Sequence, residues 1–360
     1  MTNATLVLAY LDKIGVGYKS LRFFAENFAL NDFENELKTK KDLIIKNLGE
    51  AVYLKLKNAI SSENIVKNSL EMQKYCINSI SVLDSEYPLS LKNLEDFPIV
   101  LYSKGDISLL KSKCIAIIGT RTPTFYGREV TSFFARELSK AGLVTVSGLA
   151  YGLDSEVAVG TLEAKGKTIA VLGGGLDKIY PEQNTNLAER IVENGGLLIS
   201  EYPLFHAPAK YSFLARNRII SGLSLGIVIA EAGKRSGTLN TAKHALDQGK
   251  ELFVVPGSIF SSASDGTNAL IEELPETFTT SPKQVLERLN IKPANSEKEN
   301  KKVQMGQDET LIVKTLYEGE MDFDTLATKT GISPKTLLSL LTRMEISGLI
   351  KKLPGNFYSL

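Results

Sequence analysis

Cationic and aromatic side chains gather in one short segment of the sequence, residues 210–218. Lys210, Arg216 and Arg218 carry positive charge, and Phe213 and Asn217 stand between them. Ammonium and guanidinium groups bind phosphate oxygens, and an aromatic face can stack on an unpaired base. A solvated helix start would have a similar composition. We favour a binding role because Phe213, among polar neighbours, has no evident core partner.

Glycine-rich turns follow the apolar runs of the central part of the chain. The turns with a phosphate-binding composition contain Gly119, Thr120, Arg121, Ser147, Gly148, Lys234, Arg235, Ser236 and Gly237. Glycine lets backbone N–H groups approach an anion, and a following helix N-terminus adds partial positive charge. Such turns favour glycine in any α/β protein. The phosphate interpretation is stronger here because Arg121, Lys234 and Arg235 stand where core packing needs no cation.

Four carboxylates also follow apolar runs: Asp154, Asp177, Glu201 and Glu231. They lack a paired nucleophile and base, so we expect structural support and no catalytic residue. Glu201 and Glu231 are candidates to orient Arg121 or Arg216 by bidentate pairing. Asp177 is suited to cap the turn that follows it, with an acid–base role as the alternative.

Two common nucleotide motifs are incomplete. In TLEAKGKT, residues 161–168, Thr161 replaces the first glycine of a phosphate-binding loop, and the Gly-Lys-Thr precedes an apolar run rather than a helix. The first apolar run is followed by GTRTPTFYG instead of GxGxxG. With only two cysteines and two histidines, metal ligands are scarce. We therefore expect no ATP hydrolysis, no cofactor and no metal.

The elements that must position these residues are short and regularly spaced. CIAIIG, LVTVSG, TIAVLGGG, GLLISEYP, LGIVIAEAG and ELFVVPG predict buried strands, and amphipathic helical segments separate them. This alternation predicts an α/β fold, an extended Rossmann-like, doubly wound and mainly parallel sheet, over residues 80–290. The carboxyl ends of its strands would bring the turns together.

Flanking segments have different patterns. Residues 1–75 predict a small helical domain whose Gly15 to Gly17 turn resembles a helix-hairpin-helix or SAM-like unit, with a plain helix connection as the alternative. Residues 291–307 predict a linker. Residues 308–360 predict three helices and a hairpin turning at Pro354, a C-terminal winged helix.

The overall charge requires any nucleic-acid site to be local. Lys and Arg number 42 and Asp and Glu 41, a net charge of +1. No run approaches about 18 apolar residues, and residues 1–20 lack the layout of a signal peptide. We expect a cytoplasmic protein with no membrane partner.

Seven motifs together resemble the DNA-processing protein A family, DprA or Smf. GTRTPTFYG, SGLAYGLD, GGGLDKIYPEQN, ISEYP, FLARNRIISGLS, EAGKRSGTLNTA and VVPGS occur in the family's order. The resemblance implies a core that binds and protects single-stranded DNA without sequence preference and forms a homodimer. It also implies loading of the RecA recombinase in natural transformation, without enzymatic activity, and leaves open a contact with single-strand-binding protein.

By matched position, the resemblance implies that Arg121, Lys210, Arg216 and Lys234 bind the DNA backbone and that Phe213 stacks on a base. Leu214 stands where the family often has proline, which makes the entry to that helix less rigid. The flanking domains resemble those of longer family members. Residues 310–360 hold six Lys or Arg against five acids, so duplex binding and a protein contact both remain open for the winged helix.

Two other functions compete with this interpretation. Lonely-Guy phosphoribohydrolases resemble DprA in fold, but their PGGxGTxxE signature is absent from EAGKRSGTLNTA and VVPGSI. The second alternative is a scaffold in which the core only dimerises and the winged helix does the work. Removing residues 300–360 separates that alternative from single-strand binding by the core.

Overall fold

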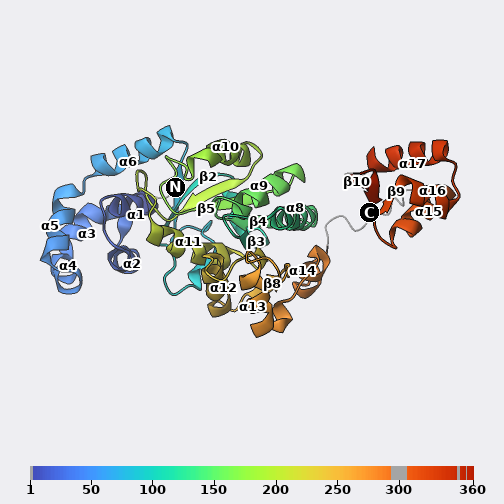
Figure 1. Cartoon of the computed structure of the whole chain (residues 1–360). Coiled ribbons are helices and arrows are strands. Elements are labelled where there is room, and N and C mark those ends of the chain that lie inside the picture. Colours follow the sequence, from blue (N-terminus) through green and yellow to red (C-terminus); the bar gives the residue numbers. More distant parts are fainter. Residues whose placement is uncertain (1–2, 293–305, 347–348, 354) are drawn as a thin grey trace. The chain divides into compact units, whose positions relative to one another are not determined.

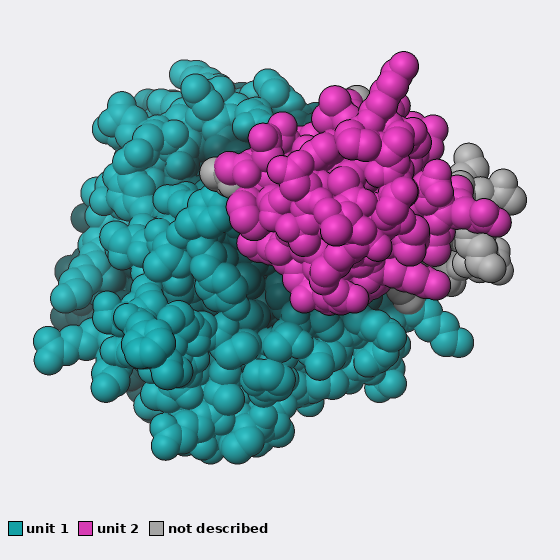
Figure 2. Space-filling view, turned by 45° about the vertical axis from the view of Figure 1, so that its right-hand side comes forward, with its two compact units in different colours: residues 1–294 teal, residues 295–360 magenta. Residues whose placement is uncertain are grey.

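The computed structural model describes residues 3–292, 306–346, 349–353 and 355–360. The chain divides into two compact units, residues 1–294 and 295–360, coloured separately in Figure 2. The predicted linker, 291–307, falls largely on 293–305, which lie outside the described residues, as does Pro354.

An eight-stranded sheet with the order β1-β2-β6-β5-β4-β3-β7-β8 forms the centre of the first unit. Its strands are β1 (Asn78–Ser81), β2 (Val100–Gly105), β3 (Cys114–Gly119), β4 (Val144–Ser147), β5 (Thr168–Leu172), β6 (Leu197–Ser200), β7 (Gly226–Glu231) and β8 (Glu251–Val254). Strands β3 to β8 pair in parallel, as their continuous apolar runs predicted. β2 is antiparallel to both β6 and β1.

Helices cover both faces of this sheet. They are α7 (Leu89–Lys92), α8 (Phe125–Lys140), α9 (Leu153–Glu163), α10 (Thr185–Glu193), α11 (Lys210–Leu223), α12 (Thr238–Asp247), α13 (Asp265–Glu273) and α14 (Pro282–Arg288). Because side chains alternate along a strand, Ile115 and Ile117 pack with α8, while Ala116 and Ile118 pack with α11. Figure 1 shows α9 and α10 on the side of the strands opposite to α11 and α12. The predicted doubly wound α/β fold is confirmed.

The N-terminal segment is helical, as expected. Its helices are α1 (Asn3–Lys13), α2 (Tyr18–Asn27), α3 (Phe33–Thr39), α4 (Lys41–Leu48), α5 (Glu50–Ala59) and α6 (Ser62–Lys74). Leu8 and Phe24 from these helices share one apolar cluster with Tyr102 and Leu198 of the sheet. The proposed boundary near residue 75 stays a prediction, since both segments belong to one compact unit.

The second unit has the elements of the predicted winged helix. They are α15 (Gln307–Leu316), β9 (Met321–Asp322), α16 (Phe323–Thr330), α17 (Pro334–Ile346), β10 (Lys351–Leu353) and β11 (Phe357–Ser359). β11 pairs with both β10 and β9 in an antiparallel sheet. Ile312, Leu326 and Leu341 are fully buried in a separate apolar core. In the described part of the chain, no helix combines the length and apolarity needed to cross a membrane.

Candidate nucleic-acid interface

A cavity of about 600 Å³ opens at the carboxyl ends of β3 and β7. The order of the strands reverses here: β4, β5 and β6 lie on one side of β3, and β7 lies on the other side. In doubly wound sheets ligands bind at this switch point, because the loops that follow the two strands diverge there. The position agrees with the place that the sequence pattern indicated.

The structure brings most of the predicted site residues to this one cavity. Those in its lining are Gly119, Thr120, Arg121, Lys210, Phe213, Arg216, Asn217, Lys234, Arg235, Ser236 and Gly237. They come from the β3 and β7 turns and from α11. Ser147, Gly148 and Arg218 are not in the lining.

Cations with free head groups lie around the cavity. Arg121, Lys210, Lys234 and Arg235 are exposed, and none of the four forms an ion pair within the described residues. The lining also contains one carboxylate, Asp154, so the cavity has an excess of positive charge although the net charge of the protein is only +1. This arrangement suits a ligand with more than one phosphate.

Arg216 contributes charge from beneath the surface. Arg216 is only 3% exposed, and its Nη1 donates to the backbone carbonyl of Val171. Its Nε has no hydrogen-bond partner among the described residues. Burial lowers the pKa of the Arg216 guanidinium to about 10, which leaves it protonated at neutral pH. Arg216 thus supplies a positive charge at a fixed position in the cavity wall, unlike a flexible surface side chain.

Gly148 makes room for that guanidinium. A Cβ atom on Gly148 would lie 2.0 Å from Arg216 Nη1, which is closer than any side chain tolerates. The Gly148 N–H donates to Asp154 Oδ2 at 3.0 Å, and the Ser147 hydroxyl donates to the Asp154 backbone carbonyl at 3.1 Å. Ser147 and Gly148 therefore support the site from behind instead of lining it.

An aromatic platform lies beside Arg121. The Arg121 guanidinium carbon is 5.6 Å from the centroid of the half-buried Phe213 ring. The Tyr180 ring lies 5.4 Å from Phe213, centroid to centroid, and the Tyr151 ring lies 6.5 Å from Tyr180. The two tyrosines were not among the predicted site residues. The only signal in the sequence is that each follows a glycine-rich strand end.

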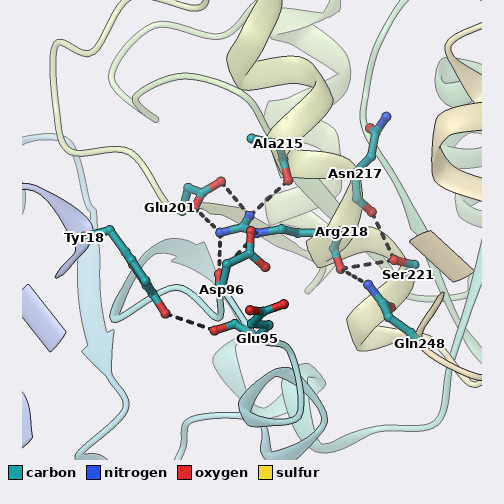
Figure 3. A network of polar contacts seen from close by, with 9 residues as sticks. All are labelled: Tyr18, Glu95, Asp96, Glu201, Ala215, Asn217, Arg218, Ser221 and Gln248. Atoms are coloured by element: carbon teal, nitrogen blue, oxygen red, sulfur yellow. Dashed lines mark hydrogen bonds and ion pairs between the residues drawn. The ribbon is translucent and has the colours of Figure 1, made fainter. Parts of the chain in front are cut away.

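Arg218 takes part in an internal network, shown in Figure 3. Its guanidinium donates to both carboxylate oxygens of Glu201 at 2.8 and 2.6 Å and to Asp96 Oδ2 at 2.8 Å. It also donates to the carbonyls of Asp96 and Ala215. The side chain is 9% exposed. We therefore remove Arg218 from the expected DNA contacts, because its donors already have acceptors.

The strand-end carboxylates hold parts of the scaffold. Glu201 pairs with Arg218 rather than with Arg121 or Arg216, which corrects the expectation from sequence. Glu231 accepts from the N–H and the hydroxyl of Thr124 at 2.9 and 2.6 Å and so fixes the start of α8. That contact also differs from the expected arginine pairing.

The two other carboxylates bind backbone N–H groups. Asp177 accepts from the backbone N–H of Phe205 at 2.7 Å, a contact with a distant loop instead of a cap on its own turn. Burial raises the pKa of the Asp154 carboxyl, although the charge of Arg216 favours its ionised form.

Among the described residues, no group of three or more His, Cys, Asp or Glu side chains is placed to hold a metal ion.

Comparison with known proteins gives matches in both units. Residues 78–290 match the family model of DNA recombination-mediator protein A, and residues 296–356 match that of the DprA winged helix domain. DNA processing protein DprA of Bacillus subtilis is 44% identical over 198 residues, 55% of this chain and 66% of that protein. Protein Smf of Escherichia coli is 35% identical over 285 residues, 77% of this chain and 76% of that protein.

Two solved structures share both fold and sequence with this chain. DNA processing protein A of Streptococcus pneumoniae has a TM-score of 0.66 and 35% identity over 80% of this chain and 98% of its own. The Helicobacter pylori protein, whose structure concerns its single-stranded DNA binding mode, has a TM-score of 0.54 and 37% identity over 59% and 95%. The family model covers most of the α/β unit, and the second model covers the winged helix. The chain therefore belongs to the DNA recombination-mediator protein A family, DprA or Smf.

Proposed function

We propose that this chain binds single-stranded DNA without sequence preference in the cavity at the carboxyl ends of β3 and β7. The observation that carries the proposal is that one cavity brings together an aromatic ring and four exposed cations, which form no ion pair with any residue that the structure describes. Cations alone would suit any phosphate. The adjoining Phe213 ring adds a face on which an unpaired base can stack.

The burial of each side chain determines the contact that we propose for it. Arg121, Lys210, Lys234 and Arg235 contact successive phosphates from the rim, together with the backbone of the turns at Gly119 and Ser236. Arg216 attracts the strand through its fixed charge, and Phe213 takes one base. Because phosphate and ring contacts do not read base edges, the binding is insensitive to sequence.

The proposed role is mediation rather than covalent chemistry. The carboxylates at the strand ends are engaged in backbone contacts or in the Arg218 ion pair. We also propose, from family membership, that the chain acts as a homodimer through its α/β core and loads RecA onto bound strands. Sedimentation would test the dimer. RecA filament assembly on DNA coated with single-strand-binding protein would test the loading and reveal any contact with that protein.

The test of single-strand binding uses the full chain with matched oligonucleotides over a salt series. We expect tighter binding to a single strand than to a duplex of the same sequence, similar affinities for different sequences, and a steep decline with salt. Equal affinity for single strand and duplex would contradict the proposal, because a base-stacking site requires unpaired bases.

A further inference from the structure

The Tyr180 ring continues the aromatic surface beyond the cavity. Its plane is tilted by 33° from that of Phe213, so the two rings face in similar directions. Tyr180 is 46% exposed and is absent from the cavity lining, whereas Phe213 is part of that lining. The aromatic surface therefore leads from the cavity outward to solvent.

Hydrogen bonding does not account for this position. The hydroxyl of Tyr180 has no hydrogen-bond partner within the described residues, unlike that of Tyr126, which donates to the Pro256 carbonyl at 2.7 Å. Burial does not account for it either, because nearly half of the residue remains in water. The exposed part of the ring is therefore available to contact a ligand.

The segment that carries Tyr180 is anchored at both ends. On one side, the Ser212 hydroxyl donates to the Gly173 carbonyl at 2.5 Å, which joins the turn after β5 to α11. On the other, Asn184 Nδ2 donates to the carbonyls of Leu149 and Ala150 at 2.9 and 3.3 Å. These bonds hold the ring in place before any ligand arrives, which lowers the entropy cost of stacking.

The neighbouring rings limit where a base can lie. A base between Phe213 and Tyr180 would need about 7 Å between the ring planes, twice the usual stacking distance, and the centroids are 5.4 Å apart. The Tyr151 ring is roughly perpendicular to that of Tyr180, with 74° between the ring planes and 6.5 Å between the centroids. The solvent-exposed part of the Tyr180 ring is the remaining place for a base.

We propose that Tyr180 stacks on a second base of the bound strand, next to the base on Phe213, so that the strand leaves the cavity over the segment between β5 and α10. This inference rests on the proposed single-strand binding. It adds a contact that depends on the bases themselves, whereas the rim cations bind the backbone.

Substitution of Tyr180 tests the inference with two ligands, an oligothymidylate and an abasic strand of equal length. We expect Tyr180→Ala to weaken oligothymidylate binding about fivefold to tenfold, the lower range for loss of one stacked base, and to leave abasic binding unchanged. Tyr180→Phe should bind like the parent chain. Phe133→Ala is a matched control, because Phe133 is similarly exposed at 44% and lies on α8 outside the lining.

Two outcomes would overturn the inference: unchanged binding of oligothymidylate by Tyr180→Ala, or equal weakening for both ligands, which would indicate a structural role. Arg121→Ala separates this from failure of the proposed function. If Arg121→Ala weakens binding of both ligands while Tyr180→Ala does not, only the Tyr180 contact fails. If neither change has an effect, single-strand binding in this cavity fails as well.

Fluorescence provides an independent readout, because the chain contains no tryptophan. Tyr180→Trp therefore introduces a single reporter at the proposed contact. Stacking predicts that saturating oligothymidylate quenches its emission and that the abasic strand does not. Unchanged emission with oligothymidylate bound would contradict the inference.

Discussion

Arg121 is the rim residue whose removal should change binding with the least effect on the fold. It is exposed, and among the described residues its side chain has a ring contact but no ion pair. We expect Arg121→Ala to weaken single-strand binding about tenfold. The slope of log affinity against log salt should also decrease by about 0.7, the value for one phosphate contact on a single strand. Anisotropy titrations over a salt series would measure both.

The matched control is Arg128→Ala. Arg128 lies in the first turn of α8, seven positions along the chain from Arg121, but it pairs with Glu156 and is not in the cavity lining. A folded Arg121→Ala protein with an unchanged salt slope would mean that Arg121 contacts no phosphate.

Arg218 leads to a prediction about stability instead of binding. Its pairing with Glu201 is largely buried, with side-chain exposures of 9% and 15%. Glu201→Gln would remove the buried carboxylate partner and leave the guanidinium with only the exposed carboxylate of Asp96. We therefore expect the free energy of unfolding to fall by about 3 kcal/mol. Urea denaturation would measure the loss.

Glu137→Gln is the comparison for an exposed ion pair. Glu137 pairs with Lys140 at 2.8 Å on the surface of α8, and its substitution should change stability by less than about 1 kcal/mol. Similar urea midpoints for the Glu201 and Glu137 variants would argue against a supporting role for the Arg218 network.

At the scale of elements, the packing of α1 against β2 contains a titratable group. The Tyr102 hydroxyl donates to Asp12 Oδ2 at 2.8 Å, and burial raises the pKa of Asp12 from 3.8 to about 7. Between about pH 4 and 7 the folded chain keeps a proton that the unfolded chain has released. Unfolding then releases a proton, so the contribution of Asp12 to stability is full below about pH 4 and is lost as the pH rises through 7.

The substitution Asp12→Asn tests this contact. An amide oxygen can still accept from Tyr102 but does not ionise, so the fall in unfolding free energy between about pH 4 and 7 should become shallower. Urea midpoints of both proteins across this range would show the difference. Parallel pH profiles would contradict the assignment.

At the scale of the whole molecule, we predict that single-strand binding belongs to the first compact unit and does not require the second. The proposed DNA contacts all belong to residues 1–294, and the second unit has its own buried core. We expect residues 1–294 alone to bind single-stranded DNA within about twofold of the full chain, a difference of about 0.4 kcal/mol. A loss of most of the affinity would instead support the winged helix as the binding element.

The sheet was well predicted where its strands are buried on both faces. The apolar runs of β3 to β8 are continuous because helices cover both sides, and this pattern is visible in one sequence. β1 and β2 were not predicted. β1 is four residues long with two polar residues on buried positions, Ser79 and Ser81, so it has no apolar run to recognise.

The gathering of Arg121 and Lys234 at one cavity was also within reach of the sequence. Parallel strands end at the same edge of a sheet, so residues directly after them must be neighbours. Pattern alone therefore determined the fold class, the edge that carries the site and the chemistry gathered there.

Only the tertiary structure distinguished between residues of the same type. Arg216 and Arg218 are two positions apart on α11 and thus point about 200° apart around the helix, one toward the cavity and one toward Glu201. Tyr180 meets Phe213 because the segment that carries Tyr180 is anchored at both ends. Asn184 donates to the Leu149 carbonyl, and the Ser212 hydroxyl donates to the Gly173 carbonyl. Sequence records which groups are present, but which acceptor satisfies a buried guanidinium depends on contacts between distant segments, and those exist only in the folded chain.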